Sequence, residues 1–87
     1  LMIGIKAYFV SQEQVRRFAI SKDISFDQFK TLTLSLIPSN DKHTHQILYL
    51  DNERDWILVN SKVEFSEALR ITPDNSLLRI KIVTHVT

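Results

Sequence analysis

The sequence predicts a single α+β domain in which one mixed sheet packs against two helices. Three observations predict this architecture. A chain of 87 residues is long enough to bury one hydrophobic core but too short for two. Several segments alternate apolar and polar residues at every second position, which indicates half-buried strands. Two other segments carry apolar residues at helical spacing, and each follows a serine that can cap a helix. The expected order of elements is β-β-α-β-β-α-β.

The first two elements form a predicted β-hairpin. Residues 3–10 alternate, and residues 14–20 form a second run rich in strand-forming residues, with a short polar turn between them. Because successive side chains of a strand point to opposite faces, Lys6 and Tyr8 are expected to point outward. The inward positions of the first strand are Ile3, Ile5, Ala7 and Phe9.

The third element is a helix with a recognisable start. Ser25 can cap it, Gln28 three residues later completes a capping box, and Ile24 against Phe29 forms a hydrophobic staple. Pro38 is expected to end the helix. The apolar residues at helical spacing are Phe29, Leu32 and Leu36.

A polar loop is expected at residues 39–45, followed by two apolar strands at residues 46–50 and 55–60. Ser61 and Glu64 make a second capping box, which predicts a second short helix. The residues of this helix expected in the core are Phe65, Ala68 and Leu69.

The last two elements are a turn at residues 72–75 and a strand at residues 76–83. Arg79 and Lys81 are expected on the outward face of this strand, opposite to Leu78, Ile80 and Ile82. Two capped helices against one amphipathic sheet, in this order, suit a ubiquitin-like β-grasp.

Composition excludes several classes of function. Eleven basic and ten acidic residues give a net charge of +1, which argues against a dedicated nucleic-acid binder. The chain has no cysteine, which excludes disulfides, thiolate metal sites and thiol nucleophiles. No apolar run approaches the roughly 18 residues of a membrane span, and no signal-peptide pattern opens the chain. We therefore expect one cytoplasmic globular domain over residues 1–87, with residues 1–4 as a flexible or non-native flank, in a longer protein.

Residues 51–55 concentrate acid in this nearly neutral chain. Asp51, Glu53 and Asp55 stand at every second position between two apolar runs. They match the first, third and fifth places of a calcium-binding EF-hand loop, but Trp56 replaces its glycine and Lys62 its final glutamate. A calcium site is therefore not expected.

A catalytic role for these acids is also not expected. They lie on a predicted open turn with Asn52 and Arg54, where solvation should keep every carboxylate ionised, whereas acid–base pairs need separated pKa values. His43 and His45 form a pair in a polar loop without further ligands, and Gly4 is the single glycine, so no phosphate-binding loop is present. We expect no enzyme activity, cofactor or metal.

The acids have a counterpart of opposite sign. Acidic residues also favour turns and keep strand edges soluble, but that interpretation does not account for Lys6 on the first strand and Arg16 and Arg17 on the second. Arg16 shares strand parity with the apolar Phe18 and Ile20, so Arg17 is the outward arginine and Arg16 is expected to emerge at the strand end. An acidic and a basic edge on one small domain suggest two complementary binding faces.

From about Ile5 to Val83 the chain resembles the Phox/Bem (PB-one) domain family, a group of β-grasp interaction modules. The acidic motif of that family is matched by Asp51, Glu53, Asp55, Ile57 and Val59, with Glu64 as an outlying acid. Its first-strand lysine is matched by Lys6. The pair Arg16 and Arg17 resembles the double-arginine strand of sequestosome-type selective autophagy receptors.

The resemblance implies a domain of the mixed type, which binds copies of itself head to tail and scaffolds polymeric assemblies. The implied basic face is Lys6, Arg16 and Arg17, and the implied acidic face is Asp51, Glu53, Asp55 and Glu64. The expected partners are the chain itself or another domain of the family, with no nucleic acid, membrane insertion or small-molecule substrate.

The sequence leaves two alternative functions open, and it differs from the family motif at two positions. One alternative is a one-to-one heterodimer in a kinase or polarity signalling scaffold. The other is a ubiquitin-like modifier, which the missing Gly-Gly tail disfavours. Arg54 stands where many family members have glycine, and Lys62 where a further acid is often found, so both are expected to weaken the acidic face.

Overall fold

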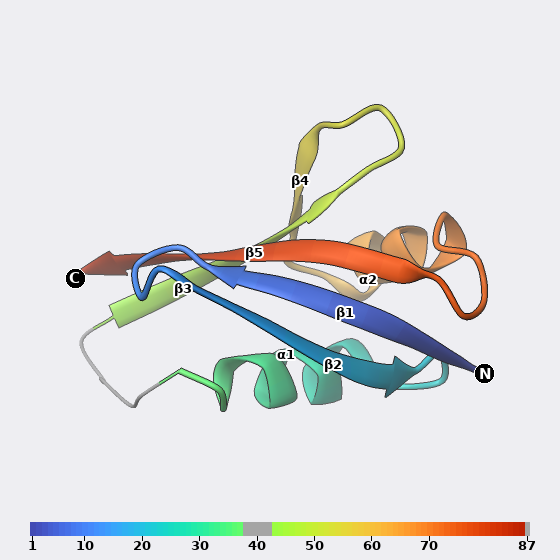
Figure 1. Ribbon diagram of the computed structural model, residues 1–87, viewed down its shortest axis with the longest axis horizontal. Coiled ribbons are helices and arrows are strands. Elements are labelled where there is room, and N and C mark those ends of the chain that lie inside the picture. Colours follow the sequence, from blue (N-terminus) through green and yellow to red (C-terminus); the bar gives the residue numbers. More distant parts are fainter. Residues whose placement is uncertain (38–42, 87) are drawn as a thin grey trace.

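The computed structural model describes residues 1–37 and 43–86, and its elements follow the predicted order (Figure 1). The strands are β1 (Met2–Phe9), β2 (Gln14–Ser21), β3 (His43–Leu50), β4 (Trp56–Val59) and β5 (Leu77–Val86). The helices are α1 (Phe26–Leu34) and α2 (Lys62–Arg70).

The five strands form one mixed sheet in the order β2-β1-β5-β3-β4. The first and last strands of the chain, β1 and β5, are parallel neighbours, and the other three pairs are antiparallel. As a result β2 and β4 lie at opposite edges of the sheet. With two helices on one face, this is the ubiquitin-like β-grasp that the sequence predicts.

One face of the sheet and both helices share a single core. The predicted alternation holds along β1, where Ile5 and Ala7 are completely buried and Lys6 between them is only half-buried. Phe29 of α1 stacks on Phe65 of α2 with ring centroids 4.7 Å apart, so the core joins the two helices as well as the sheet. Neither of the two described helices, α1 and α2, covers the other face of the sheet, which is called the helix-free face below (Figure 1).

Serine side chains set the start of both helices, as predicted. In α1, the Gln28 amide N–H donates to Ser25 Oγ and the Ser25 N–H donates to Gln28 Oε1, each at 3.1 Å. In α2, the Glu64 N–H donates to Ser61 Oγ at 3.2 Å, so Ser61 caps the helix. The return bond differs from that of the predicted capping box, because the Glu64 carboxylate accepts the N–H of Asn60, at 2.7 Å, instead of the N–H of Ser61. Such caps satisfy backbone donors that have no partner inside the helix.

The predicted face of α1 is partly wrong. Leu32 is 39% exposed, while Thr33 is completely buried. The core lies along Phe26, Phe29 and Thr33, which are one helical face at a spacing of three and four residues. The helix ends at Leu34, and Pro38, which was expected to end it, lies outside the described residues.

Two further expectations differ from the structure at strand ends. His43 and His45 belong to β3 rather than to a loop, because β5 continues to Val86 and extends the backbone ladder to their positions. Residues 39–42 of the predicted loop lie outside the described residues. Residues 2–4, expected to be part of a flank, begin β1, because they pair with the end of β2 and the Gly4 N–H donates to the Ser76 carbonyl at 2.9 Å.

Candidate functional site

Lys6 and Arg17 lie side by side on the helix-free face of the sheet. They are direct partners in the antiparallel β1–β2 pair, and directly opposite residues share a face. Lys6 is half-buried, with Nζ 5.6 Å from the centre of the Tyr8 ring, and Arg17 is exposed. Both side chains therefore point to the outside, where the sequence predicted them.

Arg16 occupies a different position. Its partner across the strand pair is the buried Ala7, so its side chain leaves the backbone on the helix side of the sheet. It is nevertheless exposed, because β2 is an edge strand and Arg16 stands near the start of that strand. The structure thus places Lys6 and Arg17 on one face and Arg16 at the adjoining edge.

A further cation, Arg79, borders Lys6 on its other side. In the parallel β1–β5 pair, Lys6 is the partner of Arg79, which is exposed. The sequence placed Arg79 on an outward face but did not connect it with Lys6, because the two are 73 positions apart and meet only through the parallel pairing. The β-grasp topology was the signal that could have found it, since it puts the first and last strands side by side.

The acidic loop, residues 51–55, joins β3 to β4. Asp51 organises it, since Asp51 Oδ1 accepts the N–H of Glu53 at 2.9 Å and the N–H of Asp55 at 2.8 Å. The backbone closes the same turn, with the Asp51 N–H bonded to the Asp55 carbonyl at 2.9 Å and the Arg54 N–H to the Asp51 carbonyl at 3.1 Å. One carboxylate oxygen of Asp51 is therefore structural.

Glu53 and Asp55 are exposed, and neither side chain forms an ion pair within the described part of the chain. Arg54 stands between them with a φ of +67°, in the left-handed region that glycine adopts without strain. A non-glycine residue pays about 1–2 kcal/mol there. The loop thus offers two free carboxylates and one strained, exposed arginine.

Glu64 is a half-buried acid of α2 that shares an electrostatic neighbour, Tyr49, with the acidic loop. Burial raises the pKa of the Tyr49 hydroxyl above its ordinary value, and three neighbouring carboxylates raise it further: Glu67, Asp51 and Glu64. The charges of Glu67, Asp51 and Glu64 thus all act on the Tyr49 hydroxyl. Glu64 Oε1 is used in capping α2, so this residue, like Asp51, combines a structural bond with a negative charge.

Glu67 is a second acid of α2, and it was not among the acidic residues that the sequence pattern predicted as a binding face. Arg70 holds it in a bidentate ion pair, with both nitrogen–oxygen distances at 2.7 Å. These hydrogen bonds lower the pKa of the Glu67 carboxyl below its ordinary value. Lys62, the first residue of α2, is exposed and carries a positive charge two positions before Glu64.

The basic and acidic residues stand at opposite edges of the sheet. Arg16 and Arg17 are on the edge strand β2, whereas the acidic loop leads into the edge strand β4 (Figure 1). Four strand spacings of about 4.8 Å each separate these edges, so the two sets cannot form ion pairs within one chain. Each set is therefore available to a second molecule.

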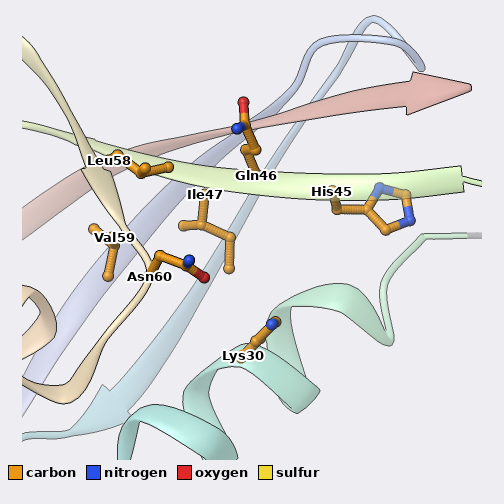
Figure 2. Close-up of a pocket in the computed structure, with 7 residues that line it drawn as sticks. All are labelled: Lys30, His45, Gln46, Ile47, Leu58, Val59 and Asn60. Atoms are coloured by element: carbon orange, nitrogen blue, oxygen red, sulfur yellow. The ribbon is translucent and has the colours of Figure 1, made fainter. Parts of the chain in front are cut away.

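A small pocket lies between α1 and the β3–β4 pair (Figure 2). Its volume is about 160 Å³, well below the roughly 300–1,000 Å³ of typical ligand pockets. The residues that line it are Lys30, His45, Gln46, Ile47, Leu58, Val59 and Asn60. His45 Nδ1 is 3.0 Å from Thr84 Oγ1, so this histidine is engaged within the sheet.

Neither a metal centre nor a membrane-spanning helix is found in the described residues. No group of three or more histidine and acidic side chains among residues 1–37 and 43–86 is placed to hold a metal ion. In the same part of the chain, neither α1 nor α2 is long and apolar enough to cross a bilayer.

Comparisons with known proteins agree with this fold. The family model of the PB1 domain matches residues 3–85. Among solved structures, the chain is similar to the cryo-EM structure of the AtNBR1-PB1 filament (L-type), with a TM-score of 0.79, 13% identity, and coverage of 98% of this chain and 99% of that one. It is also similar to the AtNBR1-PB1 domain, with a TM-score of 0.76, 11% identity, and coverage of 97% and 98%. No curated protein sequence matches the chain.

Proposed function

The chain belongs to the PB1 domain family, whose members are interaction domains that bind other PB1 domains, and from this premise we propose that it binds copies of itself head to tail. The basic face consists of Lys6, Arg17 and Arg16. The acidic face consists of Asp51, Glu53, Asp55 and Glu64. The observation that carries the proposal is the position of these faces at opposite edges of one sheet.

This position determines the kind of assembly. A contact between two different faces leaves one face of each kind unoccupied at the ends of the complex, so further copies add until a ring closes or a filament grows. The fold shared with a PB1 domain whose structure is a filament supports this proposal. The unpaired carboxylates of Glu53 and Asp55 and the outward charges of Lys6 and Arg17 are the groups that would meet at each junction.

In a longer protein, such a polymer would act as a scaffold in the cytoplasm, comparable to the assemblies of selective autophagy receptors. Joining many copies raises the effective concentration of every other binding module that the protein carries, so weak contacts with cargo become strong in sum. The domain itself needs no catalytic group or cofactor for this role.

One observation favours a second candidate, a one-to-one complex with another PB1 domain. Arg54 and Lys62 place positive charges within and beside the acidic face, whereas no acid lies at the strand positions directly beside Lys6 on the basic face. A partner with a stronger acidic face would then compete well for the basic face, because complementary charge sets specificity. In that case the chain would end a polymer rather than extend it.

Light scattering coupled to size exclusion, run over a range of concentrations, tests the proposal. The monomer has a mass of 10.2 kDa. Head-to-tail association predicts a mass that rises with concentration through many multiples of this value. A constant monomer at all concentrations contradicts self-association, and a mass that stops at the dimer contradicts the open-ended geometry.

A further inference from the structure

We propose that Arg79 is an additional binding cation beside the three residues of the basic face, and that Arg17, Lys6 and Arg79, which lie on one face of the sheet, together bind the acidic loop of a second copy. This inference rests on the proposed function and extends it to a residue of the last strand. The three residues are called the cation row below.

Strand register brings the cation row together. Lys6 is the direct partner of Arg17 on β2 and of Arg79 on β5, so the three residues share one level across three adjacent strands. Ile5 and Ala7, the chain neighbours of Lys6, point into the core. Lys6 and its two strand partners therefore lie on the helix-free face. With about 4.8 Å between strands, the row is about 10 Å long at the backbone.

The cation row has no acidic ion-pair partner among residues 1–37 and 43–86. In the described residues, side-chain ion pairs join Lys22 to Asp74 and Arg70 to Glu67, and neither pair includes a member of the row. Like charges directly opposite in a sheet are destabilising. A row of three cations therefore raises the free energy of the isolated domain, and an anionic segment laid across it removes that repulsion.

The acidic loop fits this requirement in charge and shape. Its three carboxylates belong to five consecutive residues that the Asp51 side chain holds in one tight turn. Three acids in a compact loop match three cations in a short row, and an arginine at each end of the row can bind a carboxylate in a bidentate manner.

The next cation on β5, Lys81, is not part of this arrangement. Its Nζ lies 4.7 Å from the centre of the Trp56 ring, an attraction that directs the ammonium toward β4 and away from β1. Arg79 has no such aromatic contact within the described residues. The geometry therefore distinguishes Arg79 from the other outward cation of the same strand.

The test uses two variants that each keep one face. The donor carries Lys6→Glu and retains its acidic loop. The acceptor carries Glu53→Arg and Asp55→Arg and retains the cation row. Titration calorimetry of donor into acceptor gives a dissociation constant, and adding Arg79→Ala to the acceptor should raise it by about tenfold or more, as expected for a close charge pair at an interface.

Lys30→Ala in the acceptor is the matched control. Lys30 is an exposed cation of α1, on the helix-covered side of the sheet, so its loss removes one charge without touching the cation row. It should leave the dissociation constant unchanged. Arg79→Ala should also keep or raise the thermal stability of the unbound acceptor, because it removes repulsion, whereas a merely structural role for Arg79 would lower it.

The outcomes separate this inference from the proposed function. If Arg79→Ala leaves the dissociation constant unchanged while Lys6→Ala in the acceptor weakens binding, Arg79 is outside the interface and head-to-tail binding stands. If donor and acceptor do not bind even with Arg79 present, head-to-tail binding fails and this inference fails with it. If Lys30→Ala weakens binding as much as Arg79→Ala, only net charge matters and the cation row has no specific role.

Discussion

Lys6 and Arg17 lie directly opposite each other in the β1–β2 pair, on the side of the sheet that the helices leave uncovered. The residues that alternate with Lys6, Ile5 and Ala7, are completely buried. The buried neighbours thus fix the positions of Lys6 and Arg17, while the charged side chains themselves are not part of the core. Charge reversal at these sites should therefore leave the fold intact, which makes the basic face accessible to experiment.

Lys6→Glu should abolish self-association. The substitution replaces the central cation of the basic face with an anion, which repels the acidic loop of the next molecule, and opposed like charges are strongly unfavourable at an interface. Light scattering should show a monomer at concentrations where the proposed function predicts a polymer of the unchanged chain. Circular dichroism should be the same for both, and large species formed by the folded variant would contradict the basic face.

High salt should dissociate the assembly. In the proposed assembly the faces would meet through exposed charges, and the Debye length falls from about 8 Å at physiological ionic strength to about 3 Å at 1 M salt. Sedimentation velocity at increasing salt should show a steady shift toward the monomer. An assembly that grows with salt would instead indicate an apolar interface, for which Trp56 and Tyr8 on the helix-free face are the first residues to test.

Local patterns in the sequence predicted most of the fold. Alternation along β1 and the serine caps of both helices are set by residues that are neighbours in the chain, so the sequence displays them directly. The register of α1 is different. Whether Leu32 or Thr33 faces the core depends on where the sheet lies beneath the helix, and hydrophobicity alone favoured the leucine.

Long-range pairing explains what the sequence did not show of the candidate site. Arg79 joins Lys6 only through the parallel contact between the first and last strands. His43 and His45 are polar and looked like loop residues, but β5 supplies their backbone partners. The structural role of Asp51 was hidden for another reason, since a carboxylate that closes a turn and one that binds a partner have the same sequence signature.

Arg54→Gly should strengthen self-association. It removes a positive charge from the acidic loop and relieves a left-handed backbone, at φ +67°, that disfavours side chains by about 1–2 kcal/mol. Glycine also raises the conformational entropy of the unfolded chain, which lowers the free energy of unfolding by about 0.4–1 kcal/mol. Because the relief of backbone strain is the larger effect, the free energy of unfolding should rise by about 1 kcal/mol or less. Urea unfolding and the dissociation constant of the donor–acceptor pair measure the two effects.

Asn75→Gly is the control for Arg54→Gly. Asn75 also has a positive φ, of +61°, but it lies in the turn before β5 and carries no charge. Asn75→Gly should change the free energy of unfolding in the same direction as Arg54→Gly, but by less, because asparagine tolerates a positive φ. It should leave the dissociation constant of the donor–acceptor pair unaltered. Equal affinity before and after Arg54→Gly would show that the Arg54 side chain lies outside the interface.

Asp51→Asn and Asp51→Ala should differ in stability. Asparagine keeps an oxygen that can accept the N–H groups of Glu53 and Asp55, so the loop should hold its shape while one charge is lost. Alanine removes the acceptor for both bonds, and unfolding free energy should fall by about 1–2 kcal/mol. Both variants should bind more weakly in the donor. A donor with Asp51→Asn that binds as tightly as before would restrict Asp51 to its structural role.

The last prediction concerns stoichiometry, and it tests the two faces together. The Lys6→Glu variant can offer only its acidic face, and the variant with Glu53→Arg and Asp55→Arg can offer only its basic face. Glu53 and Asp55 are chosen over Asp51 because their side chains are exposed and close no turn. Each variant alone should be a monomer, since every junction needs one face of each kind.

An equimolar mixture of these two variants should form a 1:1 dimer and nothing larger. The single intact junction uses the acidic face of one molecule and the basic face of the other, and both remaining faces carry reversed charge, so no third copy can add. Light scattering should therefore give about twice the monomer mass of 10.2 kDa at every concentration above the dissociation constant. Species larger than a dimer would reveal a second interface, whereas two folded variants that remain monomers on mixing would leave the acidic loop as a solvated turn.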